Sequence, residues 1–142
     1  EPFDGDLKGV FGYFDACRDG KLKEGAHDFN AIHKFFRDTG LTMVGMVPND
    51  DCVGGDPCKW KCARSEDTWI VYLANPSGDT PEIDDATETP ATVRVALSGG
   101  SYEARWYDPV EGSWFDASPT ADATYTSPFA GDAVLLVQTD SR

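Results

Sequence analysis

The residues of this chain whose type and spacing most directly suggest chemistry are its four cysteines. They are Cys17, Cys52, Cys58 and Cys62. An even number of cysteines, three of them in a loop rich in Gly, Pro and Asp, is typical of two disulfides in an exported protein. Three pairings are possible, and the sequence does not choose among them.

The rival hypothesis is a metal site of Cys52, Cys58 and Cys62, completed by Cys17, His27 or His33. The spacing C-x5-C-x3-C between residues 52 and 62 is not that of a zinc finger or a zinc ribbon. The sequence therefore favours disulfides over zinc, and it predicts neither a bound metal nor a cofactor.

A second segment with metal-ligating side chains covers residues 15–20, Asp-Ala-Cys-Arg-Asp-Gly. The two Asp and the Gly match the first, fifth and sixth positions of a calcium loop of the EF-hand or dockerin type. The third position is Cys17 and the twelfth is Ala26, where carboxylates are required. Because two ligands are missing, we interpret the segment as the end of a helix, not as a calcium site.

Catalytic groups are hard to assemble from the remaining polar residues. The carboxylate pairs at 50–51, 66–67 and 84–85 are sequence neighbours in expected loops. Such pairs are typical of solvated charge. His27 and His33 fall on different faces of one expected helix, without an evident Ser or Cys partner. The sequence therefore predicts no catalytic residue, and the chain is expected not to be an enzyme.

Aromatic side chains remain as candidates, because they offer flat faces to sugar rings or to a partner protein. Alternation along residues 102–107 places Trp106 and Tyr107 on opposite faces of a strand. We expect Trp106 in the core, and Tyr107 and Trp114 partly exposed. The predicted ligand-binding residues are Tyr107, Trp114, Tyr125 and Arg105.

The element expected to position these side chains is a hairpin over residues 102–115. Asp108 can accept hydrogen bonds from the turn amides, Pro109 fixes φ at the next position, and Gly112 supplies a residue with positive φ. Further period-two segments predict about six short strands in all. They lie at residues 68–74, 91–97, 124–126 and 132–138, beside the two strands of the hairpin. The last of them is apolar on both faces, so we expect it inside a sheet. The expected architecture is mainly β, an antiparallel two-layer β-sandwich.

The front of the chain has helical periodicity instead. Apolar residues recur at helical spacing between Leu7 and Cys17, and a second helix is expected from about residue 26 to 38, ended by Gly40. Its apolar face contains Phe29, Ile32, Phe35 and Phe36. We therefore expect three segments: two short helices in 1–46, a Cys-rich connector in 47–66, and a β-sandwich domain in 67–142.

The composition of the chain disfavours two classes of binding partner. The chain has 142 residues and a formal net charge of −13, which disfavours nucleic acid and anionic membrane surfaces. No apolar run approaches the roughly 20 residues of a membrane-spanning helix. The sequence lacks an initiator Met and a signal peptide, so we expect processing from a larger, exported precursor. Ser and Thr near Pro at 87–92 and 117–128 suggest O-glycosylation of an extracellular protein.

From residue 69 onward the order of segments resembles a known module. The matching pieces are 69–73, 93–97, 104–109 with Gly112, and 127–137. The module is the C-terminal β-sandwich, labelled collagen-binding, of bacterial secreted proteins with an apiosidase-like, glycoside-hydrolase-like TIM barrel. The resemblance implies that residues 24–63 are a last barrel helix and a connector. The catalytic carboxylates of the family lie in the barrel, so its hydrolase activity does not carry over to this chain.

Three hypotheses about function follow. The first is a non-catalytic extracellular module, accessory to a glycoside-hydrolase-like protein, that binds polysaccharide or matrix or packs against a neighbouring domain. The second is a structural subunit that assembles with copies of itself into an extracellular filament through helix faces and strand edges. The third is an enzyme whose site is not recognised. Nucleic acid and membrane insertion are excluded as partners.

Overall fold

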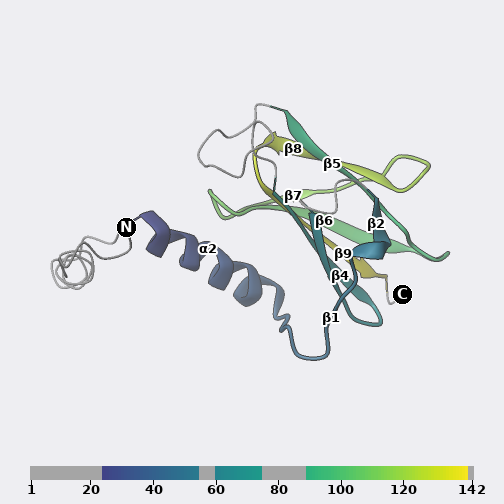
Figure 1. Ribbon diagram of the computed structural model, residues 1–142, viewed down its shortest axis with the longest axis horizontal. Coiled ribbons are helices and arrows are strands. Elements are labelled where there is room, and N and C mark those ends of the chain that lie inside the picture. The colour runs from purple at the N-terminus through teal and green to yellow at the C-terminus, as the bar shows by residue number, and fades with distance from the viewer. Residues whose placement is uncertain (1–23, 55–59, 75–88, 141–142) are drawn as a thin grey trace, which may run out of the picture.

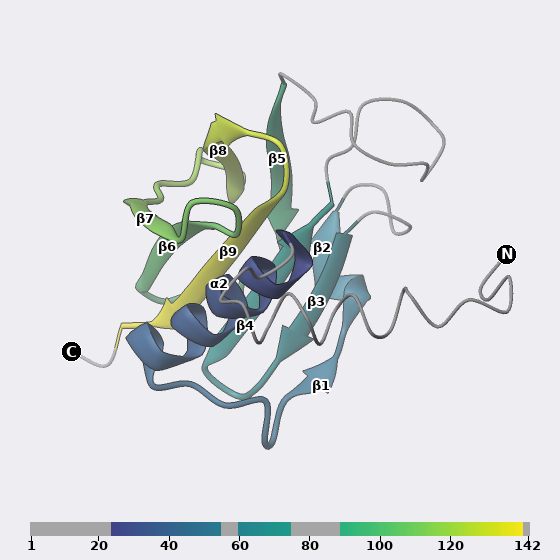
Figure 2. The same ribbon diagram turned by 90° about the vertical axis from the view of Figure 1, so that its left-hand side faces the viewer.

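In a computed structural model, the protein is described for residues 24–54, 60–74 and 89–140, with the backbone alone described over 24–29. Three layers are stacked: helix α2 (Glu24–Thr39), a six-stranded sheet and a three-stranded sheet (Figure 1, Figure 2). The six-stranded sheet has the order β1 (Val47–Pro48), β3 (Trp60–Arg64), β4 (Thr68–Leu73), β9 (Ala133–Thr139), β6 (Tyr102–Asp108), β7 (Ser113–Asp116). The three-stranded sheet has the order β2 (Val53–Gly54), β5 (Pro90–Val95), β8 (Thr124–Ala130). A short 3-10 helix, η1 (Asp50–Cys52), precedes β2.

The predicted fold class is confirmed. All strand pairs of the described residues are antiparallel, and the two sheets form a sandwich with helix α2 on its outside. The first expected helix and the candidate calcium segment lie outside the described residues. No helix of the described ranges has the length and apolarity that crossing a bilayer requires.

The main core lies between the two sheets. Alternate residues of β4 and β9 point inward from one sheet, and alternate residues of β5 point inward from the other. Burying these side chains removes apolar surface from water, which is the dominant favourable term in folding. The fully buried side chains of this core include Trp106, Tyr125, Leu73, Leu135, Val71, Val93, Val95 and Val137.

A second, smaller core lies on the outer face of the six-stranded sheet, under α2. It is built on Phe35 from the helix, Tyr107 from β6 and Leu136 from β9, all nearly inaccessible to solvent. Because Leu135 packs in the first core and Leu136 in the second, β9 is buried on both faces. This confirms the prediction, made from its apolar run, that the last strand lies inside a sheet.

Helix α2 ends where the sequence predicts. Gly40 has φ +67°, and its N–H donates a hydrogen bond to the carbonyl oxygen of Phe36 at 2.9 Å. Phe35 and Phe36 pack toward the sheet, as the expected apolar face requires. Ile32 belongs to the same expected face but is 54% exposed. The sheet therefore covers only part of that face.

The β6–β7 hairpin has the expected turn. Asp108 accepts hydrogen bonds at Oδ1 from the N–H groups of Val110 (2.8 Å) and Glu111 (3.1 Å). The N–H of Gly112 donates to the carbonyl oxygen of Asp108 at 2.8 Å, and Gly112 has φ +67°. The left-handed backbone that the sequence assigned to Gly112 is thus confirmed.

Candidate functional site

Three of the four predicted ligand-binding residues meet on the outer face of the β6–β7 hairpin. Tyr107 and Trp114 are direct cross-strand partners, with ring centroids 4.7 Å apart. The guanidinium carbon of Arg105 lies 4.5 Å from the centroid of the Trp114 ring, in cation–π geometry. Residues of one strand two apart share a face, which explains why Arg105 and Tyr107 both point to this side.

Helix α2 contributes two further residues, Phe35 and Asp38, to this group. Phe35 lies 5.4 Å from the ring of Tyr107 and 5.4 Å from the ring of Trp114, stacked on the latter. Asp38 accepts a hydrogen bond from Trp114 Nε1 at 3.0 Å. We call this group the aromatic junction; it consists of Phe35, Asp38, Arg105, Tyr107 and Trp114.

The carboxylate of the aromatic junction is held in its charged form. Lys34 Nζ lies 2.5 Å from Asp38 Oδ2. The hydrogen bond from Lys34, followed by the one from Trp114, lowers the pKa of Asp38 below its ordinary value. The sequence offered no signal for Asp38, because its partner Trp114 lies 76 residues away in the chain.

The expected partial exposure of Tyr107 is wrong. Its side chain is 1% exposed, because α2 covers the sheet face that a two-layer sandwich would leave to water. The hydroxyl donates a hydrogen bond to the backbone carbonyl oxygen of Ala31 at 2.6 Å. Burial, with a contribution from the nearby Asp38 charge, raises the pKa of Tyr107.

Tyr125 does not join the other three predicted residues. It lies on β8, 1% exposed, in the core between the sheets. Burial raises the pKa of this hydroxyl. Trp106 is also 1% exposed in that core, as predicted. Arg105 and Trp114 are therefore the two predicted ligand-binding residues that keep partial access to solvent.

The side chains of the aromatic junction contact one another. The indole N–H of Trp114 is used by Asp38, and its ring is in contact with Phe35 and with the Arg105 guanidinium. A sugar that stacked on Trp114 would compete with Arg105 for the ring. The arrangement therefore acts first to hold α2 against the sheet.

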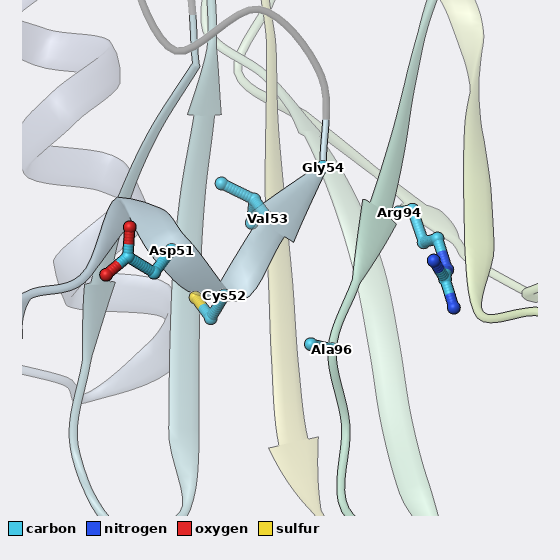
Figure 3. A pocket seen from close by; sticks show the side chains of 6 residues that line it. All are labelled: Asp51, Cys52, Val53, Gly54, Arg94 and Ala96. Atoms are coloured by element: carbon cyan, nitrogen blue, oxygen red, sulfur yellow. The ribbon is translucent and has the colours of Figure 1, made fainter.

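A shallow hollow of about 200 Å³ lies elsewhere, between the η1–β2 segment and β5 (Figure 3). Its lining is Asp51, Cys52, Val53, Gly54, Arg94 and Ala96. Asp51 and Arg94 stand at opposite sides of the hollow (Figure 3). Arg94 Nε donates to the carbonyl oxygen of Asp122 at 3.1 Å. The lining contains one carboxylate, whereas glycoside hydrolysis uses a pair about 5–10 Å apart.

Two of the four cysteines are brought together. Cys52 Sγ in η1 lies 2.9 Å from Cys62 Sγ in β3, and both side chains are buried. Cys17 and Cys58 lie outside the described residues. Within those ranges, no group of three or more His, Cys, Asp and Glu side chains is placed to hold a metal ion. His33 is exposed on α2.

Four apolar side chains on α2 and on the segment that follows it are exposed to solvent. Ile32 is 54% exposed, Met43 51%, Val44 91% and Val47 59%. These four residues, which we call the apolar strip, lie on the helix, the segment after it and β1. The usable signal was the apolar run at residues 41–47, which contains more apolar side chains than β1 and its neighbours bury.

The fold is similar to parts of solved enzymes. One structure described as a glycoside hydrolase matches 88% of this chain and 27% of its own, with a TM-score of 0.55 and 18% identity. A glycoside hydrolase family 5 protein from Bacteroides vulgatus ATCC 8482 matches 87% of this chain and 26% of its own, with a TM-score of 0.59 and 16% identity. No protein-family profile matches the chain, and no curated protein does. The chain thus spans about a quarter of the neighbours' length.

These neighbours correct one expectation and support another. The expectation that the chain is not an enzyme is contradicted, because both neighbours are named as glycoside hydrolases. The resemblance to a module associated with glycoside hydrolases is supported at the level of the fold.

Proposed function

We propose that this chain is the β-sandwich portion, with an adjoining helix, of a glycoside-hydrolase polypeptide, and that it packs against the rest of that polypeptide. One observation carries the proposal. Both neighbours contain a fold similar to this one as about a quarter of a longer chain that is named as a glycoside hydrolase. The activity of that enzyme and the identity of its glycan substrate belong to the polypeptide as a whole.

The apolar strip is the surface that this packing would use. Single exposed apolar residues are common, but Met43, Val44 and Val47 are exposed within five consecutive positions. Neighbouring apolar side chains left in water favour association with another surface. Ile32, which is 54% exposed on α2, would be covered by the rest of the polypeptide as well.

Hydrogen exchange tests this proposal. The amides of residues 41–47 should exchange more slowly in the longer polypeptide encoded by the gene than in the isolated 142-residue chain. The tip of the β6–β7 hairpin, where Val110 is 78% exposed, serves as the reference and should exchange equally in both. Equal exchange of residues 41–47 in the two forms would overturn the proposal.

A matched set of variants adds a second measurement. Met43→Ser, Val44→Ser and Val47→Ser together should lower the melting temperature of the longer polypeptide while leaving that of the isolated chain nearly unchanged. Val110→Ser is the control for loss of an exposed apolar side chain. Self-association of the isolated chain through the strip, seen by light scattering and abolished by the triple variant, would instead favour the filament hypothesis.

Polysaccharide binding is a second candidate function. The half-buried Trp114 and the guanidinium of Arg105 lie together near β7, the edge strand of the larger sheet, where a glycan chain could approach. Affinity electrophoresis in polysaccharide gels tests it: Arg105→Ala should change retardation of the chain, because the guanidinium contacts the indole face. A chain that migrates identically with and without polysaccharide in the gel would exclude this role. An extracellular location belongs to the same proposal.

A further inference from the structure

We infer that Cys52 and Cys62 form a disulfide that staples the two sheets of the sandwich together. Of the three pairings that four cysteines allow, the structure favours the one that joins these two residues. The remaining pair would be Cys17 and Cys58, which lie outside the described residues. The linkage is independent of the proposed packing on an enzyme.

The first support is the distance between the two sulfur atoms. Cys52 Sγ and Cys62 Sγ are 2.9 Å apart, whereas a covalent S–S bond is about 2.05 Å long. A combined movement of less than about 1 Å would bring them to bonding distance. Cys52 is 6% exposed and Cys62 3%, so each is the other's immediate neighbour inside the core.

The second support is a set of hydrogen bonds that attach the η1 segment to strand β3 at Cys62, which carries one of the two sulfur atoms. The N–H of Cys62 donates to Asp50 Oδ1 at 2.9 Å, and the carbonyl oxygen of Cys62 accepts from the N–H of Asn49 at 2.8 Å. Lys61 Nζ adds a hydrogen bond to Asp50 Oδ2 at 3.0 Å. These contacts fix the backbone around both cysteines. The short distance between the two sulfur atoms therefore follows from the backbone conformation.

The linkage would cross from one sheet to the other. Cys62 lies in β3 of the six-stranded sheet. Cys52 is followed directly by β2 of the three-stranded sheet, and its carbonyl oxygen accepts a hydrogen bond from the N–H of Ala96 at 2.7 Å. Since β2 pairs with β5 over two residues only, a covalent bond at Cys52 would anchor a very short strand.

The chemistry is a thiol–disulfide exchange with a low-molecular-weight disulfide such as oxidised glutathione. The two S–H bonds of Cys52 and Cys62 break, one S–S bond forms, and two protons and two electrons pass to the glutathione disulfide, which leaves as two thiols. The side chain of Cys52 lines the hollow beside β5 but is only 6% exposed (Figure 3).

Burial affects when this exchange can occur. Burial, and then the hydrogen bond with the Cys52 thiol, raises the pKa of Cys62 well above its usual range. Because the thiolate is the reactive form, the folded reduced chain should react slowly with thiol reagents. Exchange is then fastest before η1 closes onto β3, and the bond once formed is shielded from reductants.

The test uses the full chain with Cys17→Ser and Cys58→Ser, so that Cys52 and Cys62 are the only thiols. After refolding in a mixture of reduced and oxidised glutathione, the protein is denatured without reductant, alkylated and weighed by mass spectrometry. We expect no alkylation and a mass lower by two hydrogen atoms. Two alkyl groups on this variant would overturn the inference.

Peptide mapping of the wild-type chain under non-reducing conditions provides the second measurement. A peptide joining Cys52 to Cys62 is expected, whereas a link from either residue to Cys17 or Cys58 would overturn the inference. In the C17S/C58S background, reduction should lower the melting temperature by about 5–10 °C, since the bond closes a loop of about ten residues. The same background with Cys52→Ala and Cys62→Ala is the control and should not respond to reductant.

Discussion

The hydroxyl of Tyr107 donates a hydrogen bond to the backbone carbonyl oxygen of Ala31 at 2.6 Å, and thereby joins the β6–β7 hairpin to helix α2. The two residues are 76 positions apart in the chain. A carbonyl in the middle of a helix already accepts a hydrogen bond within the helix, so the tyrosine uses its second lone pair. This contact places the helix at a defined height above the sheet.

Replacing Tyr107 by Phe should lower the free energy of unfolding by about 1–2 kcal/mol, because a buried hydrogen bond is lost without changing the ring. Urea denaturation of the two chains measures the difference. Tyr72→Phe is the matched control: its hydroxyl donates to Asp132 at 2.6 Å in an exposed setting. It should cost about 0.5 kcal/mol or less. Equal losses in the two variants would show that the contact with α2 has no special weight.

Truncation of Phe35 should detach the helix from the sheet. Phe35 is 4% exposed and contacts Phe36, Tyr107 and Trp114, so Phe35→Ala should cost about 3–5 kcal/mol and speed hydrogen exchange along α2. Ile32→Ala on the same helix removes a side chain that is 54% exposed and should change stability by about 0.5 kcal/mol at most. If both variants exchange alike, the second core does not hold the helix.

Asp38 should make stability depend on acidity. Its pKa is lowered in the folded chain, first by the hydrogen bond from Lys34 and then by that from Trp114. A carboxyl group with a lowered folded pKa stabilises above its unfolded value of 3.8 and loses that contribution as pH falls toward the folded value. Asp38→Asn should therefore be less stable than wild type near neutral pH.

The difference between these two chains is measured by denaturation across pH. It should shrink steadily as pH falls from 3.8, where the carboxyl of the unfolded chain takes up a proton, toward the lower pKa of the folded chain. A difference that stays constant down to the lowest accessible pH would show that Asp38 acts through shape and not through charge. Two-dimensional NMR of the Asp38 carboxyl carbon gives the titration directly.

The turn of the β6–β7 hairpin should depend on Asp108. Asp108→Ala removes the acceptor of two backbone N–H groups, those of Val110 and Glu111, and should cost about 1 kcal/mol. Asp116→Ala, at the exposed end of β7, is the control for loss of one negative charge. Thermal unfolding compares the two, and a larger loss in the control would contradict the assigned role of the turn.

Local chemistry explains why this hairpin was predictable from sequence. The roles of Asp108 and Gly112 are set by residues within five positions of each other, so their types alone indicate the turn. The buried position of Trp106 likewise followed from alternation. The apolar run of β9 predicted a strand that is buried on both faces. These features need no knowledge of what lies across the fold.

The error at Tyr107 has a long-range cause. Alternation correctly put Tyr107 opposite Trp106, but the identity of the covering layer depends on α2, which lies some 70 residues earlier. The paired Phe35 and Phe36, which needed a surface to cover, were the available signal. Phe35 and Phe36, combined with a last strand that is apolar on both faces, would have indicated a helix on the outer face of the sheet.

The segment from residue 47 to 66 shows the same limit. We expected it to be a connector between the helices and the sandwich. It contains η1 and three strands: β1 and β3 belong to the six-stranded sheet, and β2 belongs to the three-stranded sheet. Strands β1 and β2 have two residues each, too short for any periodicity to appear. Their pairing is decided by β3 and β5, and the approach of Cys52 to Cys62 follows from that pairing.

The order of strands also governs how the protein can be made. Strand β9, the last of the described strands to leave the ribosome, lies between β4 and β6. Until Ala133–Thr139 emerge, a nascent chain carries two incomplete half-sheets with open edges at β4 and β6, which are templates for pairing with other chains. Translation that stops before residue 133 would therefore yield fragments prone to aggregate, while the few residues of β9 close both edges at once.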